Sequence, residues 1–189
     1  MTELLYPAFP APLPKGCKPE RACEMLPLTD ALGAVVGQAP RSWCHGGSKA
    51  LHPVVHLHII NRNSQVYLQK RSASKKILPL YWDTAVGGHI SYGEQVEEAL
   101  YREAREELGM FDFNPFPLLT YEWESGIEKE LVNVFAAVGD FALEPHNEEV
   151  EQGRWWSLEE IDKAAGQGIL TPNFEIEFEK IRHSLLALL

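Results

Sequence analysis

Residues 87–110 read GGHISYGEQVEEALYREAREELGM, and this stretch decides the fold of the chain. From Val96 onward its apolar residues recur at steps of three and four, which is the periodicity of an amphipathic helix. These residues are Ala99, Leu100, Ala104 and Leu108. Gly109 follows the last of them and is placed to end the helix, because glycine readily takes the left-handed conformation found there. The pattern therefore predicts a helix from Val96 to Leu108.

Three glutamates lie along one edge of this predicted helix. Glu103 and Glu107 are one turn apart, and Glu106 is three residues beyond Glu103. Clustered carboxylates repel one another unless a cation neutralises them, and oxygen ligands at this spacing suit Mg²⁺ or Mn²⁺. Arg102 can pair with Glu106 at i+4 and hold it in place. The spacing therefore indicates a site for a divalent cation, whereas any single glutamate here would be read as part of a solvated helix face.

The residues before the helix complete a known pattern. Gly87, Gly88 and Gly93 flank a predicted loop, where positive φ or close approach of the backbone to a ligand is easily accommodated. The whole stretch resembles the signature of the Nudix hydrolases, G-x5-E-x7-R-E-U-x-E-E-x-G-U with U apolar, and every defined position is filled. The filled positions are Gly88, Glu94, Arg102, Glu103, Ala104, Glu106, Glu107, Gly109 and Met110. The resemblance implies an α/β/α sandwich.

The same resemblance implies roles for the helix residues. Glu103, Glu106 and Glu107 would hold one or more Mg²⁺ or Mn²⁺ ions on the substrate's diphosphate, and Arg102 would orient these carboxylates. These four are the predicted catalytic residues. The general base stays open, because the carboxylate that serves varies within the superfamily. The candidates are Glu106, Glu107, Glu130, Glu148 and Glu149.

Length and composition predict one domain over residues 24–189 after a proline-rich arm over residues 1–23. The net charge of −10 argues against a nucleic-acid polymer as partner. The chain has no apolar run long enough to span a bilayer and no secretion signal, so we expect a cytoplasmic protein. The three cysteines form no even-numbered disulfide framework. They are Cys17, Cys23 and Cys44.

The remaining elements interleave without a regular βαβ rhythm, which predicts a mixed sheet covered by helices on both sides. Strands are expected within 24–38 (two), 54–60, 65–69, 118–123, 130–138 and 153–156, with a loop or short helix over 41–51 and an acidic loop over 144–152. Ser157 and Glu160 form a capping box for a helix through residue 165, and Thr171 with Pro172 opens a final helix to the C-terminus. We expect His56 and His58, on one face of strand 54–60, to be structural.

A second, narrower resemblance covers most of the chain. The order of EMLPLTD, LQKRSASKK, YWDTAVGGH and Tyr121 is similar to type I isopentenyl diphosphate isomerases and their Nudix relatives. In those isomerases three histidines and two glutamates hold a metal, and the matching positions here form a candidate second metal site for manganese, zinc or magnesium. They are His45, His52, His89, Glu128 and Glu130. The competing interpretation is that these are loop histidines and glutamates that face solvent.

One substitution separates hydrolysis from isomerisation. The isomerases use a cysteine as acid/base two residues before the loop histidine, and that position here is Gly87, which has no proton to give. The helix keeps all three glutamates, whereas the isomerases tend to have a degenerate helix. We therefore predict a metal-dependent hydrolase that cleaves a diphosphate bond in a nucleoside diphosphate derivative or other organic diphosphate. The alternatives are an isopentenyl-diphosphate delta-isomerase and a noncatalytic sensor of a diphosphate metabolite.

The densest basic cluster is KRSASKK, just upstream of the acidic helix. Arg71, Lys75 and Lys76 are predicted to bind the substrate's diphosphate, since a guanidinium can make paired contacts to phosphate oxygens. The other interpretation is a solvated loop. The oligomeric state stays open, although the resemblance makes a homodimer one alternative, since Nudix domains often form homodimers. The proline-rich arm would pack either on the domain or on a partner.

Overall fold

The computed structural model describes residues 24–75, 77–145 and 150–189. The proline-rich arm, Lys76, Glu148 and Glu149 therefore lie outside the described residues. Within the described ranges, a seven-stranded sheet runs in the order β5-β4-β3-β8-β7, with β6 paired to β3 and β9 paired to β4. Its strands are β3 (Leu51–Ile60), β4 (Gln65–Arg71), β5 (Trp82–Asp83), β6 (Val86–His89), β7 (Phe116–Glu124), β8 (Lys129–Val138) and β9 (Val150–Ser157). Strands β3 and β8 are parallel, while the other pairs are antiparallel, so the predicted mixed sheet is confirmed.

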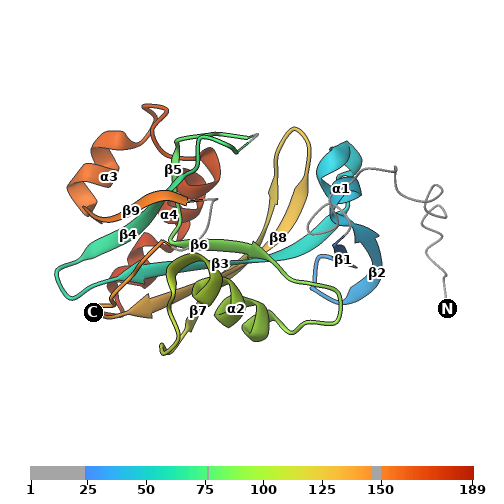
Figure 1. The fold of residues 1–189 in the computed structure, drawn as a ribbon, viewed down its shortest axis with the longest axis horizontal. Helices are drawn as coiled ribbons and strands as arrows, with labels where there is room; N and C mark the ends of the chain where they lie inside the picture. The colour runs from blue at the N-terminus through green and yellow to red at the C-terminus, as the bar shows by residue number, and fades with distance from the viewer. Residues whose placement is uncertain (1–23, 76, 146–149) are drawn as a thin grey trace.

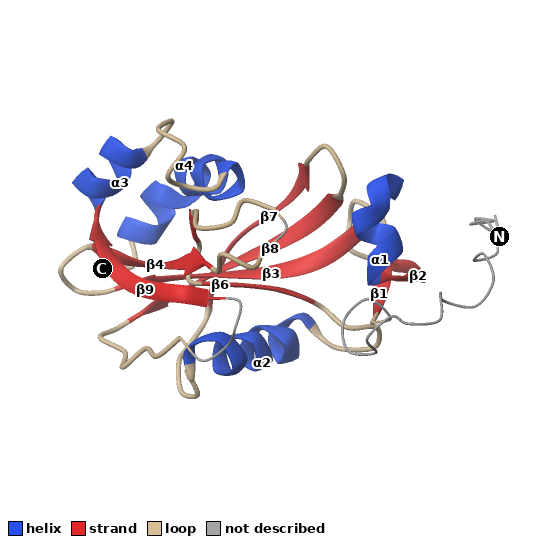
Figure 2. Ribbon diagram, turned by 45° about the horizontal axis from the view of Figure 1, so that its top comes forward, coloured by secondary structure: helices blue, strands red, loops and turns tan. Residues whose placement is uncertain are grey.

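Helices cover both faces of this sheet. Helix α2 (Val96–Leu108) lies against one face, and α3 (Leu158–Ala164) and α4 (Pro172–Leu186) lie against the other (Figure 2). The smaller β1 (Met25–Thr29) and β2 (Val35–Pro40) form a separate two-stranded sheet, followed by α1 (Arg41–Trp43) and one π-helical turn, η1 (Cys44–Ser48), at the N-terminal end of the domain (Figure 1). The α/β/α sandwich is thus confirmed. No helix in the described ranges is long and apolar enough to cross a membrane.

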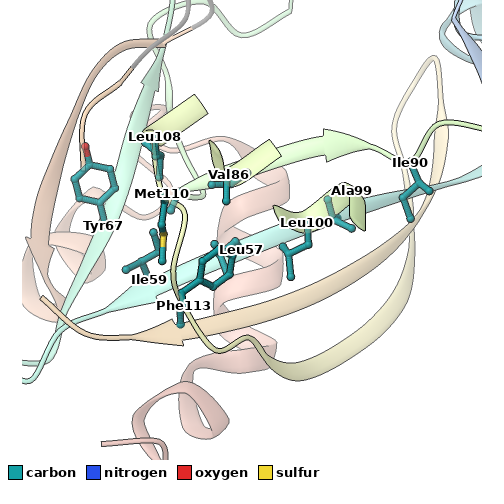
Figure 3. Packing of buried hydrophobic residues seen from close by; sticks show 14 residues of the cluster. Leu57, Ile59, Tyr67, Val86, Ile90, Ala99, Leu100, Leu108, Met110 and Phe113 are labelled. Atoms are coloured by element: carbon teal, nitrogen blue, oxygen red, sulfur yellow. The ribbon is translucent and has the colours of Figure 1, made fainter. Parts of the chain in front are cut away.

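Because side chains alternate along β3, this strand contributes to hydrophobic clusters on both faces of the sheet. Leu57 and Ile59 pack with Leu100 and Leu108 of α2, as Figure 3 shows. On the opposite face, Ile60 packs in a second cluster beneath α3 and α4. The histidines of β3 fall on this second face, because they alternate with the residues that meet α2.

Local signals placed the helices well. Helix α2 begins and ends where its apolar periodicity predicts, and Gly109 takes the left-handed conformation with φ of 62°. The capping box of Ser157 with Glu160 and the cap at Thr171 are both present. The final helix stops at Leu186, short of the C-terminus.

Strand pairing extends into two segments for which no strand was predicted. Gly87 and Gly88, which flank the loop before α2 as expected, belong to strand β6, where they pair with His56 and Val55 of β3. The acidic loop ends earlier than expected, because residues 150–152 already pair with β4 as the start of β9. In both places backbone pairing to a neighbouring strand overrides glycine content or charge, which carry no information about tertiary partners.

Candidate metal centres

Helix α2 presents its acids to strand β6. An ideal Cβ on Gly88 would lie 2.0 Å from Cδ of Glu103, so only glycine lets this carboxylate rest on the strand. Glu107 accepts hydrogen bonds at Oε2 from Gln69 Nε2 (3.0 Å) and from the Gly87 backbone N–H (3.3 Å). Strand β6 therefore fixes the positions of two carboxylates through its glycines.

These two carboxylates carry poorly compensated charge. Glu107 is 6% exposed, and burial together with the negative charge of Glu103 raises its pKa to about 7. Burial also raises the pKa of Glu103, against the opposing effect of Arg102. A divalent cation would relieve both, since carboxylate oxygens are the ligands that Mg²⁺ and Mn²⁺ prefer. Glu106 differs from both, because its side chain is 50% exposed, against 15% for Glu103.

Arg102 has a different main partner from the one predicted. Its Nε and Nη2 donate to the two carboxylate oxygens of Glu94 at 2.7 and 2.8 Å, and its Nη1 donates to Glu103 Oε1 at 2.7 Å. Glu106 is farther away, with 3.7 Å between its Oε2 and Nη1 of Arg102. Arg102 also donates to the backbone carbonyl of His89 (2.9 Å). It thus holds Glu103 and ties α2 to the end of β6.

A second centre is formed by three histidines from three elements. His45 of η1, His52 of β3 and His89 of β6 bring their ring nitrogens within 4.8 Å of one another. The Nε2 atoms of His45 and His89 are 2.8 Å apart. Burial lowers the pKa of His52 and lowers that of His89 well below its usual value, so both rings favour the neutral form that binds metal ions.

The donor chemistry of His52 fits a metal ligand. Its Nδ1 donates to the backbone carbonyl of Ala50 (2.9 Å), which leaves the lone pair on Nε2. That Nε2 is buried and has no hydrogen-bond partner in the described part of the chain. Ring nitrogens oriented in this way, with the other nitrogen bound to a carbonyl, are the usual arrangement at metal sites.

The two predicted acidic ligands are buried beside the histidines. Glu128 forms an ion pair with Nδ1 of His45, and Glu130 stands opposite His52 in the β3–β8 pairing. Burial and the negative charge of Glu128 raise the pKa of Glu130 to about 7. Burial alone would raise the pKa of Glu128, but the hydrogen bond and charge of His45 outweigh burial and lower it. Each glutamate is only 8% exposed, so neither faces solvent.

The residues of the basic cluster have different surroundings: Arg71 contacts other residues, whereas Lys75 lies near the two centres. Arg71 Nη1 is 3.1 Å from Oδ2 of Asp83, and Arg71 also donates to the carbonyl of Ile77, so its guanidinium already has partners. The positive charge of Lys75 opposes the rise that burial and Glu103 cause in the pKa of Glu107, and it adds to the fall that burial causes in the pKa of His89. Lys75 therefore lies near both centres.

A buried network lies on the same face of the sheet as the histidine centre. Glu177 of α4 is fully buried and accepts from His56 Nδ1 (2.9 Å), His58 Nε2 (2.6 Å) and the Tyr121 hydroxyl (2.8 Å). No sequence pattern predicted a role for Glu177 or Gln69, or the contact between Glu94 and Arg102. Of these residues, Glu94 could be singled out from the sequence, because it is a defined position of the signature. Glu177 could not, because it is more than a hundred residues from both histidines.

Replacing His52 by glutamine is expected to weaken Mn²⁺ binding at least about 10-fold, because a ring nitrogen poised as a ligand is lost. Isothermal titration calorimetry measures the change. The matched control is His183→Gln, which alters an exposed histidine of α4 and should leave Mn²⁺ binding unchanged. Equal Mn²⁺ affinity in the wild-type protein and the His52 variant would contradict the assignment of this centre.

The chain is similar to known proteins in both sequence and structure. Residues 50–174 match a family model described as the NUDIX domain. An isopentenyl-diphosphate Delta-isomerase from Salmonella arizonae is 33% identical over 144 residues, covering 73% of this chain and 79% of that protein. An uncharacterized Nudix hydrolase from Listeria monocytogenes is 32% identical over 127 residues, covering 66% of this chain and 74% of that protein. The crystal structure of DR0079 from Deinococcus radiodurans has a TM-score of 0.73 at 25% identity, covering 84% of this chain and 99% of that chain.

Proposed function

The chain belongs to the NUDIX family, and we propose that it is a metal-dependent hydrolase that cleaves the diphosphate bond of a nucleoside diphosphate derivative or another organic diphosphate. The observation that carries the proposal is the pair of Glu103 and the buried Glu107 on α2, which lie against strand β6 and whose negative charges a divalent cation would neutralise. A carboxylate pair of this kind is suited to metal-assisted attack by water.

Two sets of residues would hold metal ions. The first is Glu103, Glu106 and Glu107, and the second is His45, His52, His89, Glu128 and Glu130. A bound Mg²⁺ or Mn²⁺ supplies charge neutralisation on the diphosphate and lowers the pKa of the attacking water.

The chain's own residues position these groups. Arg102 orients Glu103 through its Nη1, while Gln69 and the Gly87 N–H orient Glu107. Lys75 adds positive charge near both centres, where an anionic substrate would bind. Glu106, Glu107 and Glu130 are the described candidates for the general base, because each is a carboxylate in one of the two sets.

The second candidate function is isomerisation of isopentenyl diphosphate. It is favoured by the similarity to curated isomerases and by the proximity of the three matched histidines, beside which Glu128 and Glu130 are buried. It is opposed by Gly87, because this position offers no side-chain proton. The complete acidic set on α2 favours hydrolysis instead.

The test of the proposed function is ³¹P NMR of a panel of nucleoside, sugar and isoprenoid diphosphates with Mg²⁺ or Mn²⁺, which detects phosphomonoesters as well as inorganic phosphate and diphosphate. Formation of these products that stops on addition of EDTA and returns with excess metal is the expected result. Conversion of isopentenyl to dimethylallyl diphosphate, with no hydrolysis product from any member of the panel, would overturn the proposal.

A further inference from the structure

Two histidines of β3 share one partner but differ in their access to solvent. His58 is fully buried and uses Nε2 to contact Oε1 of Glu177 at 2.6 Å. His56 uses Nδ1 for the same carboxylate, at 2.9 Å from Oε2, and its side chain keeps 11% of its surface exposed. The same carboxylate therefore anchors the two rings through opposite nitrogens.

Because His56 uses Nδ1 to contact Glu177, its other ring nitrogen, Nε2, faces strand β6. An ideal Cβ on Gly87 would lie 3.5 Å from that Nε2 and 3.4 Å from the neighbouring Cδ2. No hydrogen-bond partner for Nε2 is found among the residues that the structure describes. Because Gly87 has no side chain to cover it, this nitrogen stays available to a bound molecule.

The available nitrogen lies close to the histidine centre. Gly87 and His89 are two residues apart on β6, so they point to the same face at a separation of about 7 Å. His52 and His56 share that face on β3. A molecule whose diphosphate is held at the histidine centre can therefore reach Gly87 and His56 with its organic portion.

We propose that His56 is a specificity-determining residue, whose Nε2 hydrogen-bonds an oxygen of the substrate's organic portion. The substrates are then hydroxyl-bearing diphosphates, such as nucleoside or sugar derivatives, in preference to hydrocarbon diphosphates. This inference rests on the proposed function, because it takes the diphosphate to be bound at the centres described above.

The chemistry of the ring supports the preference. A hydrocarbon chain packed on His56 would bury Nε2 without a partner, and sites built to hydrogen-bond a substrate discriminate strongly against analogues that lack the group. Burial alone would lower the pKa of His56, but the charge and hydrogen bonds of Glu177 outweigh it and, with Glu130 and Asp83, raise the pKa to about 9. Nε2 is therefore an N–H donor at neutral pH, suited to a hydroxyl or carbonyl oxygen.

The test compares two variants that each keep the Glu177 contact. His56→Asn retains a polar atom near the Nδ1 position and loses the donor at Nε2, whereas His58→Gln retains a donor near its own Nε2 position and is the matched control. Both are made in the Glu107→Gln protein, so that turnover does not consume the probes. Calorimetry with Mg²⁺ measures Kd for ADP-ribose, UDP-glucose, isopentenyl diphosphate and inorganic diphosphate, and thermal unfolding verifies that each variant is folded.

ADP-ribose and UDP-glucose are the hydroxyl-bearing probes. For whichever of them the parent binds with the lower Kd, His56→Asn is expected to raise that Kd about 10-fold or more, as for a lost substrate hydrogen bond. Binding of isopentenyl diphosphate and inorganic diphosphate should change less than about twofold, and His58→Gln should bind all four probes as the parent does. His56→Gln, which restores a donor near the Nε2 position, should recover most of the lost affinity.

Three results would overturn the inference. The first is that the parent protein binds isopentenyl diphosphate at least as tightly as both hydroxyl-bearing probes. The second is that His56→Asn leaves all four affinities unchanged. The third is that His56→Asn weakens binding of inorganic diphosphate as much as binding of the hydroxyl-bearing probes. Each of these three results leaves the proposed hydrolase intact, whereas failure of both the wild-type and Glu107→Gln proteins to bind inorganic diphosphate would overturn the proposed function and this inference together.

Discussion

Replacing Glu107 by glutamine is expected to lower kcat about 100-fold or more, because metal-assisted charge stabilisation of several kcal/mol depends on this carboxylate and each 1.36 kcal/mol is tenfold in rate. The fold should survive, since the glutamine side-chain oxygen can still accept from Gln69 and the Gly87 N–H. Steady-state kinetics with Mg²⁺, together with thermal unfolding, measures both effects.

The control for this variant lies on the same helix. Glu97 is exposed on the first turn of α2, so Glu97→Gln makes the same chemical change away from β6 and should leave kcat unchanged. A Glu107 variant that keeps turnover within a few-fold of the wild-type value would show that this carboxylate does not serve the reaction.

Replacing Glu177 by glutamine is expected to lower the free energy of unfolding by about 3 kcal/mol at neutral pH, because it removes one partner of a buried ion pair. Glu177 accepts from His56, His58 and Tyr121, so the change leaves two buried histidines and a half-buried hydroxyl with a weaker acceptor. Urea denaturation measures the change. Glu179→Gln, an exposed change on the same helix, should have little effect.

The effect of Glu177 should also depend on pH. The folded-state pKa of His56 is raised to about 9 from an ordinary value of 6.5. The stability from its charge is therefore fully present below pH 6.5 and is lost as pH rises through about 9. The difference in unfolding free energy between wild type and Glu177→Gln should thus shrink over this range. A difference below about 1 kcal/mol at pH 7, or one that grows toward pH 10, would contradict the ion pair.

The sequence is most informative where contacts are local. Glu103 and Glu107 are one turn apart on α2, so helical periodicity alone brings their carboxylates together. The caps at Ser157 and Thr171 are equally local, because the hydroxyl and the backbone N–H that it accepts from are three residues apart. Such features can be predicted before any tertiary structure is known.

The remaining parts of the site depend on contacts between distant segments. Periodicity cannot show that Gly88 lies under Glu103, since the contact exists only after β6 pairs with β3. The histidine centre joins His45, His52 and His89 from three elements, and the resemblance to the isomerases, rather than any local pattern, placed them in one set. Neither a local sequence pattern nor a family resemblance connected Glu177 with His56, His58 and Tyr121.

Hydrolysis with water as the attacking group is the central claim, and oxygen-18 labelling tests it most directly. The protein is incubated with Mg²⁺ and the diphosphate panel in H₂¹⁸O, and the products are analysed by mass spectrometry. Our account predicts one ¹⁸O atom in a phosphate-containing product of a hydroxyl-bearing diphosphate. Formation of unlabelled dimethylallyl diphosphate from isopentenyl diphosphate, with no labelled phosphate from any substrate, would contradict it.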